Sequence, residues 1–245
     1  MNSTLKLVER QIASSDLRKR LDTADNPTGR FYSPDGVAFG PCLLISRECG
    51  SGGSQLAQLV GERLGWNVFD SRIVDEIAHA ANVHKRLVES VDEHIHSLWE
   101  QNWREFLLDE LPDKKYLGHL RQVVMTLGHH GNVVLVGRGA QFLLPHQCGL
   151  RVRLVAPLDL RVRDVAEAEG ISFEQARAKV KAVDAERSAF VWKTFRKDIS
   201  SPLNHDVIIN IGDIKLEIAT RTVLSMLQDK LGFKLDSPAL TATHA

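Results

Sequence analysis

Short apolar runs alternate with helix-length amphipathic segments after Pro41, and this alternation constrains the fold more than any other feature of the chain. The runs have the length, β-branching and flanking turn residues of buried strands. They are CLLIS (42–46), WNVFD (66–70), NVVLVG (132–137), LRVRLVA (150–156) and DVIINIG (206–212). Strands that alternate with helices predict a parallel sheet with helices on both faces. We therefore expect an α/β fold.

Helical periodicity fills the intervals between the strand-like runs. The expected helices span about 54–64, 71–81, 84–93, 96–110, 114–129, 158–169, 172–195 and 213–231. Ligands of parallel sheets bind outside the carboxyl ends of the strands. The segment 46–54, Asp70, the turn 137–139 and Ala156-Pro157 should therefore meet at one edge of the sheet.

The pattern divides the chain into an N-terminal arm or extension at 1–40, a main domain at 41–232 and a C-terminal tail at 233–245. The arm contains one short amphipathic helix followed by many turn formers, and we expect it to lie outside the core. It could be a flexible leader or a homodimer contact, and the general behaviour of chain ends favours the leader.

The 61 residues between the second and third strands, 71–131, are too long for a simple crossover and contain no strand-like run. We expect a helical insert there. Trp99, Trp103, Phe106 and Leu107 fall on a shared face of one of its helices, which is more typical of a core than of a base-stacking surface.

Composition limits the partners and the compartment. Lys plus Arg and Asp plus Glu both number 31, so no whole-molecule field attracts nucleic acid or acidic membrane. The three cysteines are too few and too scattered for a disulfide scaffold. No apolar run reaches 18 residues, and no export signal is visible at the N-terminus. We expect a cytoplasmic protein without nucleic-acid or membrane partners.

The stretch ISRECGSGGS (45–54) lies between a strand and a helix. Its glycines permit positive φ, and the amides of 50–54 can form an anion nest at the helix N-terminus. A plain tight turn explains these glycines equally well. The stretch also lacks the lysine of a phosphate-binding P-loop, because Gly53 stands in the lysine position and Arg47 in that of the first glycine. Ser54 keeps the hydroxyl position.

Basic residues elsewhere could supply charge to the same edge of the sheet. Arg138, in the turn VGRGA, is suited to a bidentate grip on phosphate or carboxylate, although a surface ion pair would also explain it. The segment 172–200 is rich in cations, which indicates either a lid over a polyphosphate or a solvated helix face. Its cations are Arg177, Lys181, Arg187, Lys193, Arg196 and Lys197.

Six stretches, in order and at suitable spacing between about Cys42 and Leu227, carry a family resemblance. They are ISRECGSGGSQLAQLVGERLGWNVFDSRIVDEIA, VVLVGRGAQFLL, RVRLVAPLDLRVRDVAEAEGIS, VDAERSAF, KD at 197–198 and HDVIINIG. Together they resemble the cytidylate kinase-like family, a branch of the P-loop nucleoside monophosphate kinases. In this branch the loop lysine is commonly absent and GSGG is usual.

The resemblance implies a three-layer α/β/α P-loop kinase fold with strand order 2-3-1-4-5. Residues 71–131 would form the acceptor-binding insert and 172–200 the lid. It also implies ATP and Mg²⁺ as cofactors and small nucleotides as substrates. The reaction would transfer a phosphoryl group to a nucleoside monophosphate, CMP or dCMP in the first place.

The resemblance also implies roles for individual residues. ATP would lie on Gly50, Ser51, Gly52, Gly53, Ser54 and Gln55. Substrate-binding residues would be Arg47, Asp70, Arg138 and Asp184. Catalytic residues would be Arg138, Arg187 and Lys197, which with Arg47 could replace the missing lysine. The metal ligands stay open.

Two other functions compete with this interpretation. The missing lysine and the N-terminal arm favour a nucleotide-binding regulatory protein with weak transfer, whereas the retained arginines favour an enzyme. A kinase for a non-nucleotide acceptor is the third alternative, because the insert shapes the acceptor pocket and its specificity is not encoded in a recognisable motif.

Overall fold

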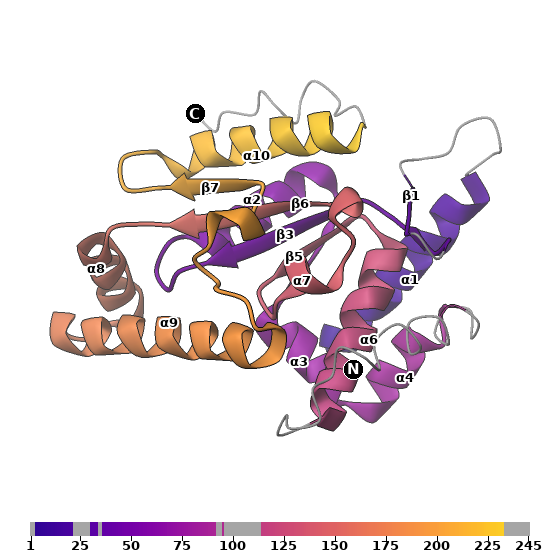
Figure 1. Ribbon diagram of the computed structural model, residues 1–245, viewed down its shortest axis with the longest axis horizontal. Helices are drawn as coiled ribbons and strands as arrows, with labels where there is room; N and C mark the ends of the chain where they lie inside the picture. The colour runs from indigo at the N-terminus through magenta and orange to yellow at the C-terminus, as the bar shows by residue number, and fades with distance from the viewer. Residues whose placement is uncertain (1–2, 22–29, 34–35, 92–94, 96–113, 233–245) are drawn as a thin grey trace.

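A computed structural model describes residues 3–21, 30–33, 36–91, 95 and 114–232 (Figure 1). Its centre is a five-stranded parallel sheet of order β4-β5-β3-β6-β7. The strands are β3 (Cys42–Arg47), β4 (Asn67–Asp70), β5 (Val133–Val136), β6 (Gly149–Val155) and β7 (Val207–Asn210). Counted along the chain from β3, this order is 2-3-1-4-5, so the expected α/β architecture and strand order are confirmed.

Both faces of the sheet are apolar, as parallel strands require. Leu43 and Ile45 of β3 belong to the cluster beneath α2 (Gly53–Leu64) and α10 (Leu216–Leu231). Cys42 and Leu44 alternate with them and belong to the cluster on the opposite face. The period-two alternation of β3 therefore places helices on both sides.

The second face carries most of the remaining helices. They are α3 (Ser71–His79), α4 (Ala81–Val88), α6 (Lys114–His130) and α7 (Ala140–Leu143), with η1 (His146–Cys148) and η2 (Pro202–Asn204) in loops. Helices α8 (Leu158–Glu169) and α9 (Phe173–Phe195) pack on each other through a small separate cluster. The arrows of β6 and β7 point toward α8 (Figure 1).

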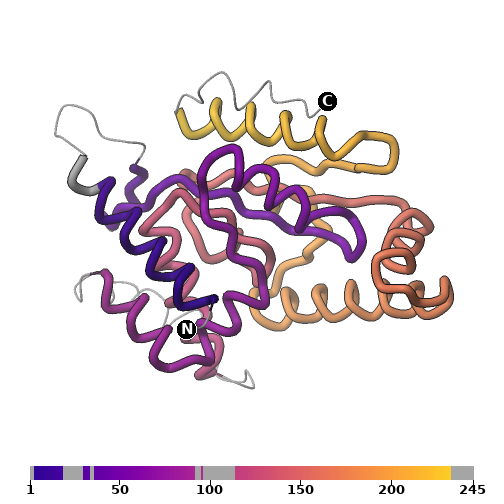
Figure 2. Tube along the Cα trace, turned by 180° about the vertical axis from the view of Figure 1, so that it is seen from behind, coloured from indigo at the N-terminus to yellow at the C-terminus, as the bar shows by residue number. Residues whose placement is uncertain are grey.

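The N-terminal segment is joined to the core, which corrects our expectation of an arm outside it. Helix α1 (Ser3–Leu21) packs beside α3, α4 and α6 (Figure 2). Val8 is fully buried in the cluster of the second face. Gln11 donates to the carbonyl oxygen of Gly131 (2.8 Å) and accepts from Asn67 (2.6 Å). A short antiparallel pair, β1 (Phe31–Tyr32) and β2 (Ala38–Phe39), follows it and was not foreseen.

Helix boundaries agree with the sequence pattern except where local geometry intervenes. Ala80 has extended backbone (φ −84°, ψ 95°), so α3 ends at His79 and α4 begins at Ala81, earlier than expected. Helix α9 begins with a capping box between Ser172 and Gln175. The expected helix 96–110, with Trp99, Trp103, Phe106 and Leu107, lies outside the described residues.

Membrane insertion finds no support in the helices that the structure describes. None of them combines the length and the apolar character that a transmembrane span requires.

His205, just before β7, should make the stability of the fold depend on pH. Burial is the main cause that lowers the pKa of His205 to about 4, below its ordinary 6.5. The folded state therefore keeps His205 neutral while the unfolded chain takes up a proton, so stability present above pH 6.5 is lost as the pH falls toward 4. We expect a loss of roughly 2 to 3 kcal/mol across this window.

Urea titrations at several pH values would measure this loss. His205→Asn keeps a donor for the carbonyl oxygen of Ser201, 3.2 Å from Nδ1, and removes the titration. The variant should lose less stability than the wild type between pH 6.5 and 4. Parallel curves for the two proteins would contradict the assignment.

Candidate active site

The glycine-rich stretch forms the turn between β3 and α2. Gly50 and Gly52 have φ of +78° and +72°, a region that favours glycine. A Cβ on Gly50 would lie 2.7 Å from the carbonyl oxygen of Arg161, and one on Gly53 would lie 2.6 Å from Cβ of Arg47. Conformation and close packing therefore both require glycine in this loop.

The start of α2 presents backbone amides that have no acceptor within the helix. The first helical hydrogen bond runs from the amide of Leu56 to the carbonyl of Gly52. The amides of Gly53, Ser54 and Gln55 precede it, and the last two residues are exposed. Such a helix start, preceded by left-handed glycines, is suited to phosphate oxygens.

Ser51 is expected among the ATP-binding residues but lies inside the loop. It is fully buried, and its hydroxyl donates to the carbonyl oxygen of Glu48 (2.9 Å) and lies 3.3 Å from that of Leu154. The hydroxyl therefore stabilises the loop from within.

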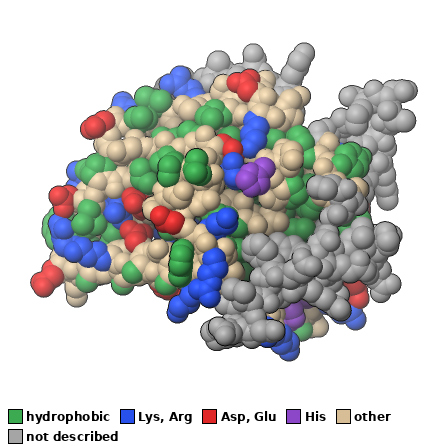
Figure 3. Space-filling view, in the orientation of Figure 1, with side chains coloured by type: hydrophobic (Ala, Val, Ile, Leu, Met, Phe, Trp, Pro, Cys, Tyr) green, Lys and Arg blue, Asp and Glu red, His purple; other side chains and the backbone are tan. Residues whose placement is uncertain are grey.

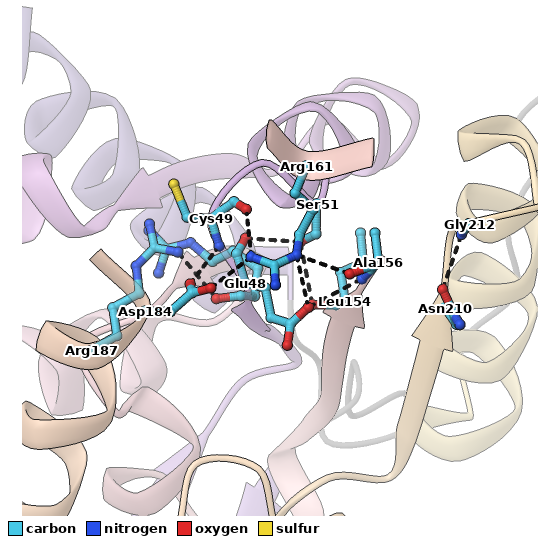
Figure 4. A network of polar contacts seen from close by, with 11 residues as sticks. Glu48, Cys49, Ser51, Leu154, Ala156, Arg161, Asp184, Arg187, Asn210 and Gly212 are labelled. Atoms are coloured by element: carbon cyan, nitrogen blue, oxygen red, sulfur yellow. Dashed lines mark hydrogen bonds and ion pairs between the residues drawn. The ribbon is translucent and has the colours of Figure 1, made fainter. Parts of the chain in front are cut away.

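Arg161 of α8 joins the loop to α9 (Figure 4). Its side chain is only 9% exposed. Nη1 donates to Asp184 (2.6 Å) and to the carbonyl oxygen of Cys49 (3.1 Å). Nε donates to the carbonyl oxygen of Ala156 (2.9 Å) and lies 3.3 Å from the carboxylate of Glu48. One arginine thus connects β3, β6, α8 and α9.

Asp184, expected among the substrate-binding residues, accepts hydrogen bonds from the protein at both carboxylate oxygens. The amide of Cys49 donates to Oδ1 (2.7 Å), and Arg161 donates to Oδ2. In this structure the carboxylate connects α9 to the glycine loop, and a contact with substrate stays a prediction.

A second turn, after β5, has three successive residues with positive φ. The values are +85° for Gly137, +50° for Arg138 and +69° for Gly139. A Cβ on Gly137 would lie 2.2 Å from Nη1 of Arg47, and one on Gly139 would lie 2.1 Å from the ring of Phe195. The two glycines allow these side chains to approach, and Arg138 itself adopts a conformation that is uncommon outside glycine.

The guanidinium of Arg138 is held along one edge by Asp75 and on one face by Phe190. Its Nε donates to both oxygens of Asp75 (2.8 and 3.0 Å), and Nη2 also donates to this carboxylate. The guanidinium carbon lies 5.3 Å from the centre of the Phe190 ring. Burial is the largest single effect on the pKa of Arg138 and lowers it, but the hydrogen bond to Asp75 and the charges of Tyr116, Asp75 and Glu186 together raise it by more, so the net shift is upward. Arg138 is therefore a fixed positive charge.

The arginines at 47, 138 and 187 all line one cavity of about 310 Å³ between the two turns and α9. Its other lining residues are Ser71, Gly137, Gly139, Gln141, Glu186, Ala189, Phe190, Val191, Lys193 and Ile199. The space-filling view shows Lys and Arg side chains gathered over the carboxyl end of α9, where Lys193, Arg196 and Lys197 lie (Figure 3). Three of the four residues expected to replace the P-loop lysine thus share one cavity.

Arg47 and Arg187 make this cavity strongly positive. Nη1 of Arg187 donates to the carbonyl oxygen of Arg47 (3.2 Å), and Nη2 of Arg47 donates to Ser71 (3.3 Å). Within the described residues, neither arginine has a carboxylate at ion-pair distance. Burial is the main cause that lowers the pKa of Arg47 to about 10, and the charge of Arg187 lowers it as well. With a pKa of about 10, Arg47 remains charged at neutral pH, and with Arg187 beside it the cavity is suited to an anion.

Asp70 and Lys197 lie apart from the cavity lining, as Asp184 and the loop residues 50–55 do. Asp70 caps α3 by accepting from the amide of Ile73 (2.8 Å). Lys197 is exposed beyond the end of α9 and does not line the cavity. Lys193, one of the cations of the segment 172–200, does line it. Its spacing from Glu186 and Phe190 is helical, so this face of α9 was detectable from the sequence.

The described residues offer no ready-made metal centre, since no group of three or more His, Cys, Asp or Glu side chains converges among them. Nucleotide-dependent Mg²⁺ sites need only one or two protein ligands besides the substrate phosphates. Ser54, exposed in the first turn of α2, therefore fits a role as a Mg²⁺ ligand.

The sequence profile of the cytidylate kinase-like family matches residues 43–213. The chain belongs to this family. The match includes the glycine loop, the turn at 137–139 and α9, which together form the candidate site. Membership of a kinase-like family supports phosphoryl transfer as the chemistry of this site.

A curated relative agrees with this assignment, and a solved structure shares the fold. The chain is 25% identical over 189 residues to a cytidylate kinase from Ignicoccus hospitalis, which covers 76% of this chain and 98% of the relative. A crystal structure of an uncharacterised protein from Eubacterium ventriosum shares the fold with a TM-score of 0.64 at 19% identity, covering 77% of this chain and 98% of that one.

Proposed function

We propose that this member of the cytidylate kinase-like family transfers the γ-phosphoryl group of ATP to a nucleoside monophosphate, with CMP or dCMP as the acceptor. The observation that carries the proposal is the cavity that Arg47, Arg138 and Arg187 line beside the glycine loop. Its charge fits a phosphate monoester, and the adjoining helix start fits a second phosphate group.

Arg47 lies between the two parts of the proposed site, the glycine loop and the cavity. The stem of Arg47 lies against Gly53, close enough that any Cβ at position 53 would clash with it. The guanidinium of the same residue lies over Gly137 in the cavity wall. Arg47 thus leaves no room for the lysine that other P-loops carry, and it brings a positive charge to the boundary between the two phosphate groups.

Catalysis would rest on positioning and charge neutralisation. The amides of Gly50 and of Gly52 to Gln55 would hold the ATP phosphates, because the amide of Ser51 already donates to the carbonyl oxygen of Glu48 (3.3 Å). Arg138 and Arg187 would neutralise the transferring phosphoryl group, and Phe190 and α9 would exclude water from it. Mg²⁺ bound with ATP would supply further charge neutralisation, and Ser54 is the residue that would hold it.

Crystals soaked with a non-hydrolysable ATP analogue and CMP would locate both groups. We expect the triphosphate on the amides at the start of α2, from Gly52 to Gln55, and the CMP phosphate within hydrogen-bond distance of Arg138 and Arg187. A CMP phosphate bound away from both arginines would contradict the proposed site.

A further inference from the structure

Arg138 depends on neighbours from other elements for its orientation. It lies between two left-handed glycines, and its own φ of +50° is a conformation that non-glycine residues adopt at some cost. Nothing in the turn itself fixes the side chain. The groups that do so come from α3, α6 and α9.

Asp75 of α3 receives three of these contacts. Arg138 donates to it through Nε and Nη2, which occupies one whole edge of the guanidinium. Tyr116 of α6 donates to Oδ1 of the same carboxylate (2.6 Å), and the carboxylate is only about one-fifth exposed. Tyr116 therefore holds Asp75 in place, and Asp75 in turn holds Arg138.

Phe190 of α9 completes the arrangement from the face of the guanidinium. With one face on the ring and the Nε–Nη2 edge on Asp75, Nη1 is the nitrogen that makes no hydrogen bond to the described protein. An anion in the cavity would have this nitrogen available to it.

We propose that Asp75 is a positioning residue that, supported by Tyr116, orients Arg138 so that Nη1 meets the acceptor phosphate. The inference rests on the proposed function, since it assigns Asp75 to the same site. Asp75 would act only through Arg138 and would not touch the substrate.

A double-mutant cycle between Asp75→Asn and Arg138→Ala tests this directly. In the wild-type background, Asp75→Asn should lower kcat/KM for CMP about 10-fold to 30-fold, whereas in the Arg138→Ala background it should change it less than about 2-fold. In the Arg138→Ala background Asp75 has no guanidinium to orient, so its substitution should have little effect. Tyr116→Phe, a milder change, should give a loss of about 2-fold to 5-fold with the same dependence on Arg138.

Asp159→Asn is the matched control, because Asp159 pairs with Arg177 on the exposed surface. It should leave kcat/KM unchanged. Melting temperatures of all variants would show that the folded state persists. Calorimetry with inorganic phosphate, in the four proteins of the cycle, separates the inference from the proposed function because it requires no turnover.

A phosphate affinity that Asp75→Asn weakens only when Arg138 is present supports the positioning role, even in a protein that turns over no CMP. Equal losses in both backgrounds would overturn it, because Asp75 would then act on the fold in general. Unchanged phosphate affinity and unchanged kcat/KM in Asp75→Asn would overturn it as well.

Discussion

Arg138→Ala should lower kcat by about 10³-fold, the scale on which phosphate-facing arginines contribute to phosphoryl transfer. Arg187→Ala should have an effect of the same order. Both guanidinium groups line the cavity that we assign to the reacting phosphates, and a chain without the P-loop lysine has fewer charges to share the task. Steady-state assays of ADP formation with CMP would measure the loss.

Arg163→Ala provides the matched control for these two variants. Arg163 lies on α8 with its side chain 58% exposed and pairs with the neighbouring Asp164. Turnover should be close to wild type. Near-normal rates in both Arg138→Ala and Arg187→Ala would show that the phosphate-facing roles are wrong.

Arg161→Met should destabilise the fold by about 2 to 3 kcal/mol, somewhat below the 3–5 kcal/mol typical of breaking a fully buried ion pair. Arg161 is almost completely buried, but its partners Glu48 and Asp184 have side chains that are 25% and 28% exposed. Water can therefore hydrate the two carboxylates after the substitution, which compensates part of the lost stability. Two carboxylates would be left facing the carbonyl oxygens of Cys49 and Ala156.

Thermal unfolding would detect this as a decrease in Tm of about 5 to 10 °C for a chain of this size. Arg177→Met breaks an exposed pair with Asp159 and should change stability by less than about 0.5 kcal/mol. Equal effects of the two substitutions would contradict the structural role of Arg161. A lower ATP affinity in Arg161→Met should accompany the lower Tm, because the same residue shapes the phosphate loop.

The strands and most helices could be predicted because their patterns are local. Leu43 and Ile45 alternate with Cys42 and Leu44, and each set faces a different helical layer. The role of α1 could not be predicted, since only the tertiary structure places Val8 in the core. The 31–39 hairpin has strands of two residues, too short for a periodicity to register.

The candidate site was predictable in its position and less so in its contacts. The carboxyl-edge rule correctly placed Arg47 beside Arg138. Arg138 and Asp75 are 63 residues apart in the sequence, and no sequence motif indicates that they pair. The contacts of Asp184 with Arg161 likewise depend on how α9 packs against α8. Sequence patterns therefore located the charges, and packing decided which of them are paired.

Transfer of the γ-phosphoryl group from ATP to CMP, followed as the formation of CDP, tests the central claim most directly. With Mg²⁺ present, we expect CDP and ADP to form in equal amounts and to depend on both substrates. ATP binding by calorimetry without acceptor-dependent turnover, across a panel of nucleoside monophosphates, would contradict the claim and would favour a nucleotide-binding regulatory protein.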